Sequence, residues 1–343
     1  MKKLTRTSRY HLVTYALIIA AFAVLQTMQV RGTISASLRG MLVPICAYVV
    51  MAASLNLTVG ILGELSLGHA GFMSVGAFLG TASAMALQDA VPFAPLRLTI
   101  ALLVGALFAG ITGFLIGIPV LRLNGDYLAI VTLAFGEIIK AVFNNLYLGV
   151  DNRGIHVSLL SDNTHLAEGG KLIIQGPMGI GGIRKISTFP AGFVLVMVTL
   201  IIIFNLVGSR AGRAIMAIRD NRIAAESVGV NIVKYKMMAF VTSAAMAGAA
   251  GALFAMNYST VVANKFDFNT SILVLVFVVL GGLGNMLGSI IAAAALTILP
   301  EALRQFSDYR MLVYAIVLIL VMLITNSPAV RALYSRRFGK EEA

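Results

Sequence analysis

Two opposite charges stand within an apolar stretch of this 343-residue chain, where they could serve ion or solute transport. Glu137 and Lys140 are three residues apart, so a helix would carry both on one face. A charge in the middle of a bilayer costs about 2.5–3.5 kcal/mol on the insertion scale and therefore needs a partner or water. The pair could neutralise itself as a buried or subunit-facing bridge, or Glu137 could carry protons. Their mutual spacing favours the bridge.

Two glycine-rich stretches could expose backbone groups to a ligand. Gly63–Gly71 holds three glycines between two apolar runs, and a similar break occurs at Gly281–Gly288. A broken helix at either place could present amides and carbonyls to a zwitterion, although small residues also let helices pack closely in lipid. The expected lining residues of a substrate path are Gly63, Ser66, Gly68, His69, Gly281, Gly282 and Gly284.

His69 has no second ligand at metal spacing, so we expect it to make a hydrogen bond near the path or its cytoplasmic gate, and no metal site is predicted. Residues for catalysis are also lacking. No G-x-x-x-x-G-K-[ST] motif occurs, and the glycines of GGLGNMLG lack a phosphate-binding lysine. There is no paired acidic motif and no nucleophile with a base, which argues against a membrane enzyme. The chain is expected to hold no cofactor.

Composition places these residues in a membrane. The chain is 59% hydrophobic and only 12% charged, whereas soluble domains carry about 25% charged residues. A soluble enzyme, a disordered tail and a secreted disulfide scaffold are therefore excluded, and the single Cys46 allows no intrachain disulfide. The 26 Lys and Arg against 14 Asp and Glu fit cationic anchors on cytoplasmic loops rather than nucleic-acid binding.

Charge-free stretches long enough to cross the bilayer recur along the whole sequence. They predict an all-helical integral membrane protein, with one transmembrane domain over 1–343 and about ten helices, some short or broken at Gly-rich points. The expected spans are 10–30, 40–63, 65–88, 98–121, 126–148, 186–209, 237–264, two short or tilted helices within 268–300, and 311–330.

The distribution of Lys and Arg favours both termini on the cytoplasmic side. A cleaved signal peptide over residues 1–37 is the alternative, but no A-x-A site follows the apolar run. Two hydrophilic segments then remain, an external loop at 149–189 and an internal one at 209–236. The internal segment has helical propensity, and by itself it could be an amphipathic connector lying on the inner leaflet.

Several motifs in these segments resemble those of a known protein family. Ala224-Ala225-x-x-x-Gly229 resembles the loop with which ABC importer permeases contact their ATPases, although Ile223 stands where that motif often has Glu. Further blocks, in order from about residue 40 to 325, are similar to the LivM branch of the branched-chain amino acid permease family. They are GELSLGHAGF (63–72), GDYLAIVTLAFGEI (125–138), Gly212-Arg213-Ala214 with Ala217-Ile218-Arg219-Asp220, LGGLG (280–284) and Leu299-Pro300-Glu301.

The resemblance implies half of the translocation path of an ATP-driven importer in a bacterial inner membrane. Its implied partners are a second homologous permease, two ABC ATPase subunits that hydrolyse ATP, and an extracytoplasmic binding protein. Leucine, isoleucine or valine is the implied substrate, with other amino acids, amides or urea as alternatives. The implied ATPase-coupling residues are Arg213, Arg219, Asp220, Arg222, Ala224, Ala225, Glu226 and Gly229.

One departure concerns the external loop. The family's Thr-Gly-Gly-Pro-x-Gly-Ile reads Ile174-Gln175-Gly176-Pro177-Met178-Gly179-Ile180 here, after an apparent insertion near 150–172. That loop faces the binding protein in the family, so docking specificity is less directly implied than the pump architecture. The rival from another class is an ion-driven secondary transporter that works alone through Glu137.

Overall fold

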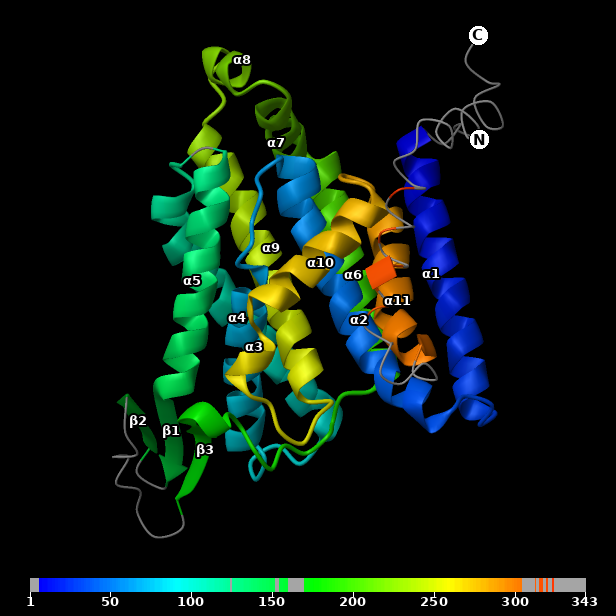
Figure 1. The fold of residues 1–343 in the computed structure, drawn as a ribbon, viewed down its shortest axis with the longest axis vertical. Helices are drawn as coiled ribbons and strands as arrows, with labels where there is room; N and C mark the ends of the chain where they lie inside the picture. The colour runs from blue at the N-terminus through cyan, green and yellow to red at the C-terminus, as the bar shows by residue number, and fades with distance from the viewer. Residues whose placement is uncertain are drawn as a thin grey trace.

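The structure is a computed structural model that describes residues 6–123, 125–151, 154–159 and 170–303, with isolated helical positions beyond them. The described chain is a helical bundle with a small β-sheet at one end and two short helices at the other (Figure 1). Its helices are α1 (Arg6–Val30), α2 (Ala36–Asn56), α3 (His69–Ala86), α4 (Ala94–Val120), α5 (Asp126–Asn145), α6 (Phe189–Gly208), α7 (Arg210–Asp220), α8 (Arg222–Ser227), α9 (Ile232–Ala255), α10 (Phe268–Gly281) and α11 (Met286–Ala302).

Membrane-crossing helices dominate this bundle. Seven helical segments of the described chain are long and apolar enough to cross a bilayer, and α11 is a shorter apolar helix. Nine of the ten expected spans have a helix at the predicted place, including the two short helices within 268–300. The tenth, 311–330, lies outside the described residues apart from isolated positions. The prediction of a mostly helical, multi-pass membrane protein is confirmed.

The centre of the bundle is built on small residues. Helices α3, α4 and α9 approach so closely that a Cβ on Gly76 would lie 1.9 Å from the carbonyl oxygen of Gly248. A Cβ on Gly248 would in turn lie 2.4 Å from the carbonyl oxygen of Gly105. Such contact between backbones is how helices associate in lipid, where apolar side chains gain little by leaving the solvent.

A Gly76→Ala substitution should therefore destabilise the fold. The methyl group would overlap a backbone carbonyl, and overpacking of this kind costs about 1–3 kcal/mol. Gly110→Ala on α4 is the matched control, because its Cβ would meet only ordinary contacts at 3.5 and 3.9 Å. The measurement is the thermal midpoint of each purified variant in detergent. Equal midpoints for the two variants would contradict the packing argument.

Two helices begin inside the bundle rather than at its surface. After α2, a π-helical turn (Leu57–Leu62) ends at Gly63, whose φ is +82°, and an extended segment then descends to the start of α3 (Figure 1). Likewise, α10 begins about midway between the two ends of the bundle (Figure 1). Its 14 residues span about 21 Å at 1.5 Å per residue, less than the ~30 Å hydrocarbon core, so the membrane-crossing segment also includes the residues from Ala263 that precede α10.

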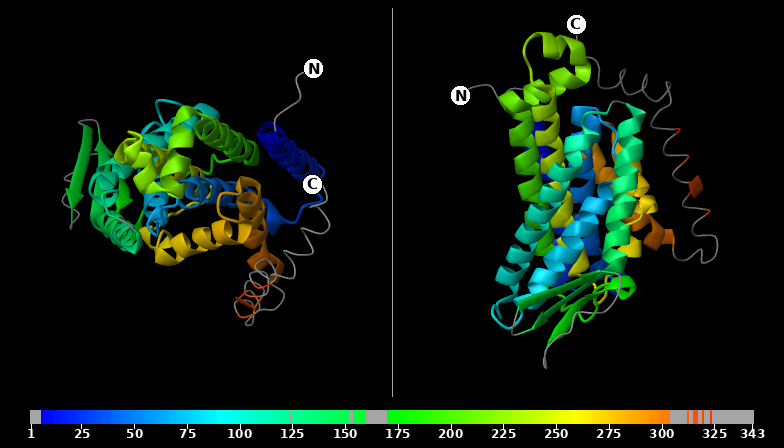
Figure 2. Two further views of the ribbon diagram at one scale, coloured as in Figure 1. Left: turned by 90° about the horizontal axis from the view of Figure 1, so that it is seen from above. Right: turned by 90° about the vertical axis from the view of Figure 1, so that its left-hand side faces the viewer.

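The segment expected as an external loop contains a sheet. Strands β1 (Leu146–Asp151), β2 (Gly154–Leu159) and β3 (Lys171–Gln175) are antiparallel in the order β2-β1-β3. The sheet lies at the end of the bundle opposite α7 and α8 (Figure 2). Because β1 starts at Leu146, the helix expected over 126–148 ends at Asn145. The short strands alternate too briefly for hydropathy alone to reveal them.

Candidate functional site

Helices α7 and α8 occupy the segment expected to couple to an ATPase. Ser209 caps α7 by accepting a hydrogen bond from the Gly212 amide at 3.1 Å, and Asn221 caps α8 through the Ala224 amide at 3.0 Å. Gly229, with φ +83°, turns the chain toward α9. Since α9 begins at Ile232, the connecting segment occupies 209–231 rather than 209–236.

The expected coupling residues divide by exposure. Ala225 is buried with Ile218 and Ile232 in a small apolar cluster that holds α8 against α7 and α9. The others are exposed: Arg213, Arg219, Asp220, Arg222, Ala224, Glu226 and Gly229. Most of the predicted surface is therefore available to a partner, whereas Ala225 packs beneath it and holds α8 in place.

Two apolar residues of this segment lie on the surface, although neither was among the expected coupling residues. Ile223 is 81% exposed and Val228 is 78% exposed, both on or beside α8. Isolated apolar side chains are common on surfaces, but Ile223 lies within, and Val228 directly after, a six-residue helix that projects from the end of the bundle (Figure 2). Exposed apolar groups rimmed by charges are typical of a protein contact.

Helix α7 directly contacts the π-helical turn that follows α2. The Arg219 guanidinium donates from Nη1 to the Gly60 carbonyl oxygen at 3.2 Å and pairs with Asp220 at 2.9 Å. Its stem also covers Gly63, where a Cβ would lie 2.6 Å from Arg219 Cγ. These contacts join α7 directly to the π-helical turn and to the residue that ends it.

A buried ion pair adds a second connection. Lys236 of α9 binds Glu64, and the side chains are 3% and 13% exposed respectively. Glu64 directly follows Gly63, so α9 holds the segment that leads from the π-helical turn to α3. The two residues are far apart in sequence, and the charge pattern alone did not indicate that they pair.

The two glycine-rich breaks meet at this end of the bundle. The Asn56 side chain accepts from the Gly284 amide at 2.8 Å and donates to Ser289 Oγ at 3.0 Å. Gly282 and Gly284 have φ of +92° and +81°, which forms the turn between α10 and α11. A Cβ on Gly60 would lie 2.2 Å from the Gly284 amide nitrogen, so only glycine allows this contact.

Three of the remaining expected path residues lie on or before helices α10 and α3. Gly281 packs against α11, where its Cβ would lie 2.3 Å from the Ser289 amide nitrogen. His69 is 2% exposed and shares a 2.8 Å hydrogen bond between Nε2 and Ser54 Oγ, which links α3 to α2. Ser66 is buried, and its hydroxyl has no hydrogen-bond partner among the described residues. Within the described chain, no three His, Cys, Asp or Glu side chains could hold a metal.

A crevice too small to admit a water molecule lies where the beginnings of α3 and α10 meet the middle of α5. The Ala70 amide donates to Ser271 Oγ at 3.1 Å, joining the first turns of α3 and α10. Gly68 contacts α5 so closely that its Cβ would lie 2.0 Å from the Thr132 carbonyl oxygen. The crevice is lined by Leu67, Gly71, Leu133, Gly136, Glu137, Phe266, Asp267, Phe268 and Ser271.

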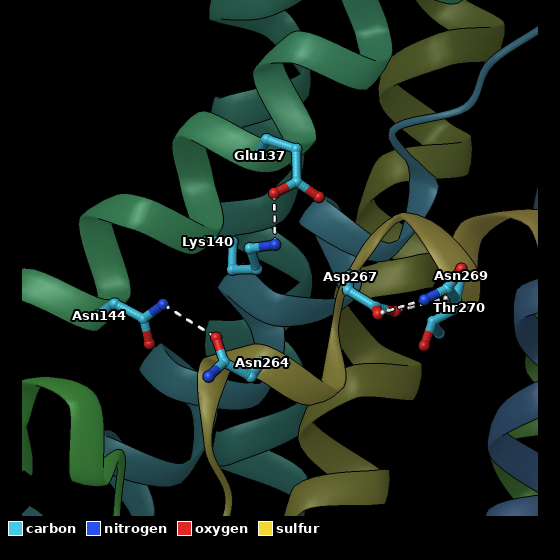
Figure 3. Close-up of polar contacts among 7 residues, drawn as sticks. All are labelled: Glu137, Lys140, Asn144, Asn264, Asp267, Asn269 and Thr270. Carbon is cyan, nitrogen blue, oxygen red and sulfur yellow. Dashed lines mark hydrogen bonds and ion pairs between the residues drawn. The ribbon is translucent and has the colours of Figure 1, made fainter.

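Glu137 lines this crevice and forms an ion pair with Lys140 on α5, with side chains 43% and 23% exposed respectively. Figure 3 shows them near the start of α10, where Asp267 accepts from the Thr270 amide at 3.0 Å and from the Asn269 side chain at 2.9 Å. One turn further along α5, Asn144 donates to Asn264 at 3.1 Å. Polar side chains thus gather on one face of α5, and the pair is not buried within this chain.

Comparison with known proteins supplies the family. The model described as "Branched-chain amino acid transport system / permease component" matches residues 37–322. LivM, the high-affinity branched-chain amino acid transport system permease protein of Escherichia coli, is 35% identical over 327 residues, which cover 92% of this chain and 74% of that protein. LivM of Salmonella typhimurium is 35% identical over 290 residues, which cover 80% of this chain and 66% of that protein.

No solved structure matches the chain. The family match nevertheless covers the broken helices, the crevice and the α7–α8 segment together. The chain belongs to the family of permease components of branched-chain amino acid transport systems, and it is a multi-pass membrane transport subunit.

Proposed function

We propose that this chain forms half of the translocation path of an ATP-driven importer for leucine, isoleucine and valine. The observation that carries the proposal is the α7–α8 projection, which presents Ile223 and Val228 outward while Arg219 binds the broken helix at Gly60. A partner docked on α8 can move α7, and α7 can move the π-helical turn that contains Gly60. The names of the LivM relatives support the choice of substrate.

The assembly we propose contains a second homologous permease, two ABC ATPases and an extracytoplasmic binding protein. ATP is bound and hydrolysed only by the ATPases, and this chain carries no enzymatic site or cofactor of its own. The sheet of β1–β3 lies at the end opposite α7 and α8 (Figure 1), and we propose that this end faces the binding protein. The α7–α8 end is then cytoplasmic in a bacterial inner membrane. Helix α1 begins at that same end, which supports a cytoplasmic N-terminus, and we propose the same side for the C-terminus.

Ile223→Asp should break the contact with the ATPase. A charge placed on an apolar docking surface leaves a carboxylate desolvated at the interface, and we expect the amount of ATPase that co-purifies to fall about tenfold. Ile223→Leu is the matched control and should keep the contact. The measurement is recovery of the ATPases with this tagged chain, followed by ATP-driven leucine uptake in proteoliposomes with the binding protein present.

The alternative, a secondary transporter, predicts transport without any ATPase. This chain reconstituted alone would carry leucine when a proton gradient is imposed, and Ile223→Asp would leave that transport unchanged. Such a result would overturn the proposal, as would unchanged ATPase recovery in Ile223→Asp.

A further inference from the structure

A polar surface lies where α5 passes the start of α10. The ion pair of Glu137 and Lys140 on α5 is partly exposed, at 43% and 23%. Beside it, Asn144 of α5 contacts the exposed Asn264, and Asn269 in the first turn of α10 is exposed as well. Figure 3 shows these side chains together. We call them the α5 surface, and it lies at membrane depth because α5 is long and apolar enough to cross a bilayer.

The outer faces of two neighbouring membrane helices differ from the α5 surface. Leu103 and Leu107 on α4 and Val198 and Ile201 on α6 are all exposed, and such apolar side chains suit contact with lipid tails. Ionisable groups within a membrane instead face protein or water, because their exposure to hydrocarbon is costly. The α5 surface is therefore covered by something other than lipid.

Strand β2 adds an uncovered apolar face to the same part of the molecule. Val157 and Leu159 of β2 lie opposite Leu148 and Leu146 of β1, so all four side chains are on one face of the sheet. On β1 this face packs against the bundle, whereas on β2 the side chains at 157 and 159 are 61% and 59% exposed. Figure 1 shows β2 as the outermost strand, beside the end of α5 from which the sheet continues.

We infer that the second homologous permease packs against the α5 surface and extends beneath the apolar face of β2. The inference rests on the proposed function, which supplies this partner. The binding protein and the ATPases act from the two sides of the membrane, so among the proposed partners only a membrane-embedded chain reaches the middle of α5. Its side chains, with any water they enclose, replace the lipid that the charges exclude.

The chemistry of the partner surface follows from the two parts of the contact. Opposite Glu137 and Lys140 the second permease presents polar or charged side chains, since interface charges are arranged to be complementary. Beneath Val157 and Leu159 it presents apolar ones, which remove these two side chains from water. The strand then acts as an overhang on the outer end of the partner, and its other face remains for the binding protein.

Photocrosslinking locates the partner. Benzoylphenylalanine is placed at Ala141, exposed one turn beyond Glu137 on α5, and at Ile201, exposed on α6, as the control. At the sheet, the probe at Val157 is compared with a probe at Ser158, because successive residues of a strand point to opposite faces. The complete importer is irradiated in proteoliposomes, and mass spectrometry identifies the chain captured by each probe.

We expect the probes at 141 and 157 to form a covalent product with the second permease, and the probes at 201 and 158 to form none with it. A product between two copies of this chain, or capture of lipid alone at 141, would overturn the contact at α5. Capture of the binding protein at 157 would overturn the contact at β2. If the second permease does not purify with this chain, the proposed function fails, whereas co-purification without these products overturns the inference alone.

Removal of the charges distinguishes a contact between proteins from a bridge that faces lipid. With Glu137→Leu and Lys140→Leu together, polar groups of the partner lose their counterparts, and we expect recovery of the second permease to fall about tenfold. Glu137→Gln with Lys140→Gln keeps hydrogen bonding and should restore part of it. Asp89→Leu with Lys171→Leu, which removes an exposed pair, is the control. Leucines suit lipid better than charges do, so unchanged or increased recovery in the first double variant would overturn the inference.

Discussion

Lys236→Met should destabilise this chain by about 3–5 kcal/mol, because it leaves the largely buried carboxylate of Glu64 without its partner. Lys236 is 3% exposed and Glu64 is 13% exposed, so water can replace only a small part of the lost interaction with the ammonium. The affected segment also positions the start of α3. The loss should be visible as a lower thermal midpoint and lower recovery of the purified chain in detergent.

A second substitution shows that the unpaired charge is the cause. When Glu64→Gln is combined with Lys236→Met, no buried charge remains, and most of the stability should return. Lys171→Met is the control for loss of an ion pair as such, because Lys171 and Asp89 are 71% and 81% exposed and exposed pairs contribute about 0–1 kcal/mol. A double variant as unstable as Lys236→Met would contradict this explanation and would indicate that the lysine stem itself is needed for packing.

The helices could be predicted from the sequence because the length and charge of each apolar run decide where a membrane helix forms. Charges end each apolar run, and a bilayer requires about 20 such residues for each crossing. The glycines within 281–288 likewise predicted the break between α10 and α11, where Gly282 and Gly284 take positive φ. The sheet was missed because strands of five and six residues carry little periodic signal and pair across a long connection.

The assembly of the site could not be predicted in the same way. Asn56 with Gly284 and Glu64 with Lys236 each join residues far apart in sequence, so no spacing rule brings them together. The candidate path residues separated into a group near Arg219 and a group beside the crevice for this reason. Glu137 and Lys140 are the exception, because a helix places residues three apart side by side.

Arg219→Ala should uncouple transport from ATP hydrolysis. It removes the hydrogen bond to the Gly60 carbonyl oxygen and the stem that covers Gly63, while Ile223 and Val228 on the docking surface stay in place. The ATPases should therefore still bind and hydrolyse ATP, but α7 would no longer move the π-helical turn with it. We expect leucine uptake per ATP hydrolysed to fall about tenfold, a loss that corresponds to about 1.4 kcal/mol of coupling.

Lys234→Ala provides the control, since Lys234 is an exposed basic residue at the same end of the bundle. Both activities are measured on the same proteoliposomes, so that a change in the number of assembled complexes cancels in the ratio. Two results would contradict the coupling role of Arg219. An unchanged ratio would mean that α7 acts on the path through other contacts, and a parallel loss of both activities would place Arg219 in the docking surface itself. A selective fall in uptake identifies the contacts of Arg219 with Gly60 and Gly63 as the connection through which α7 and α8 act on the π-helical turn.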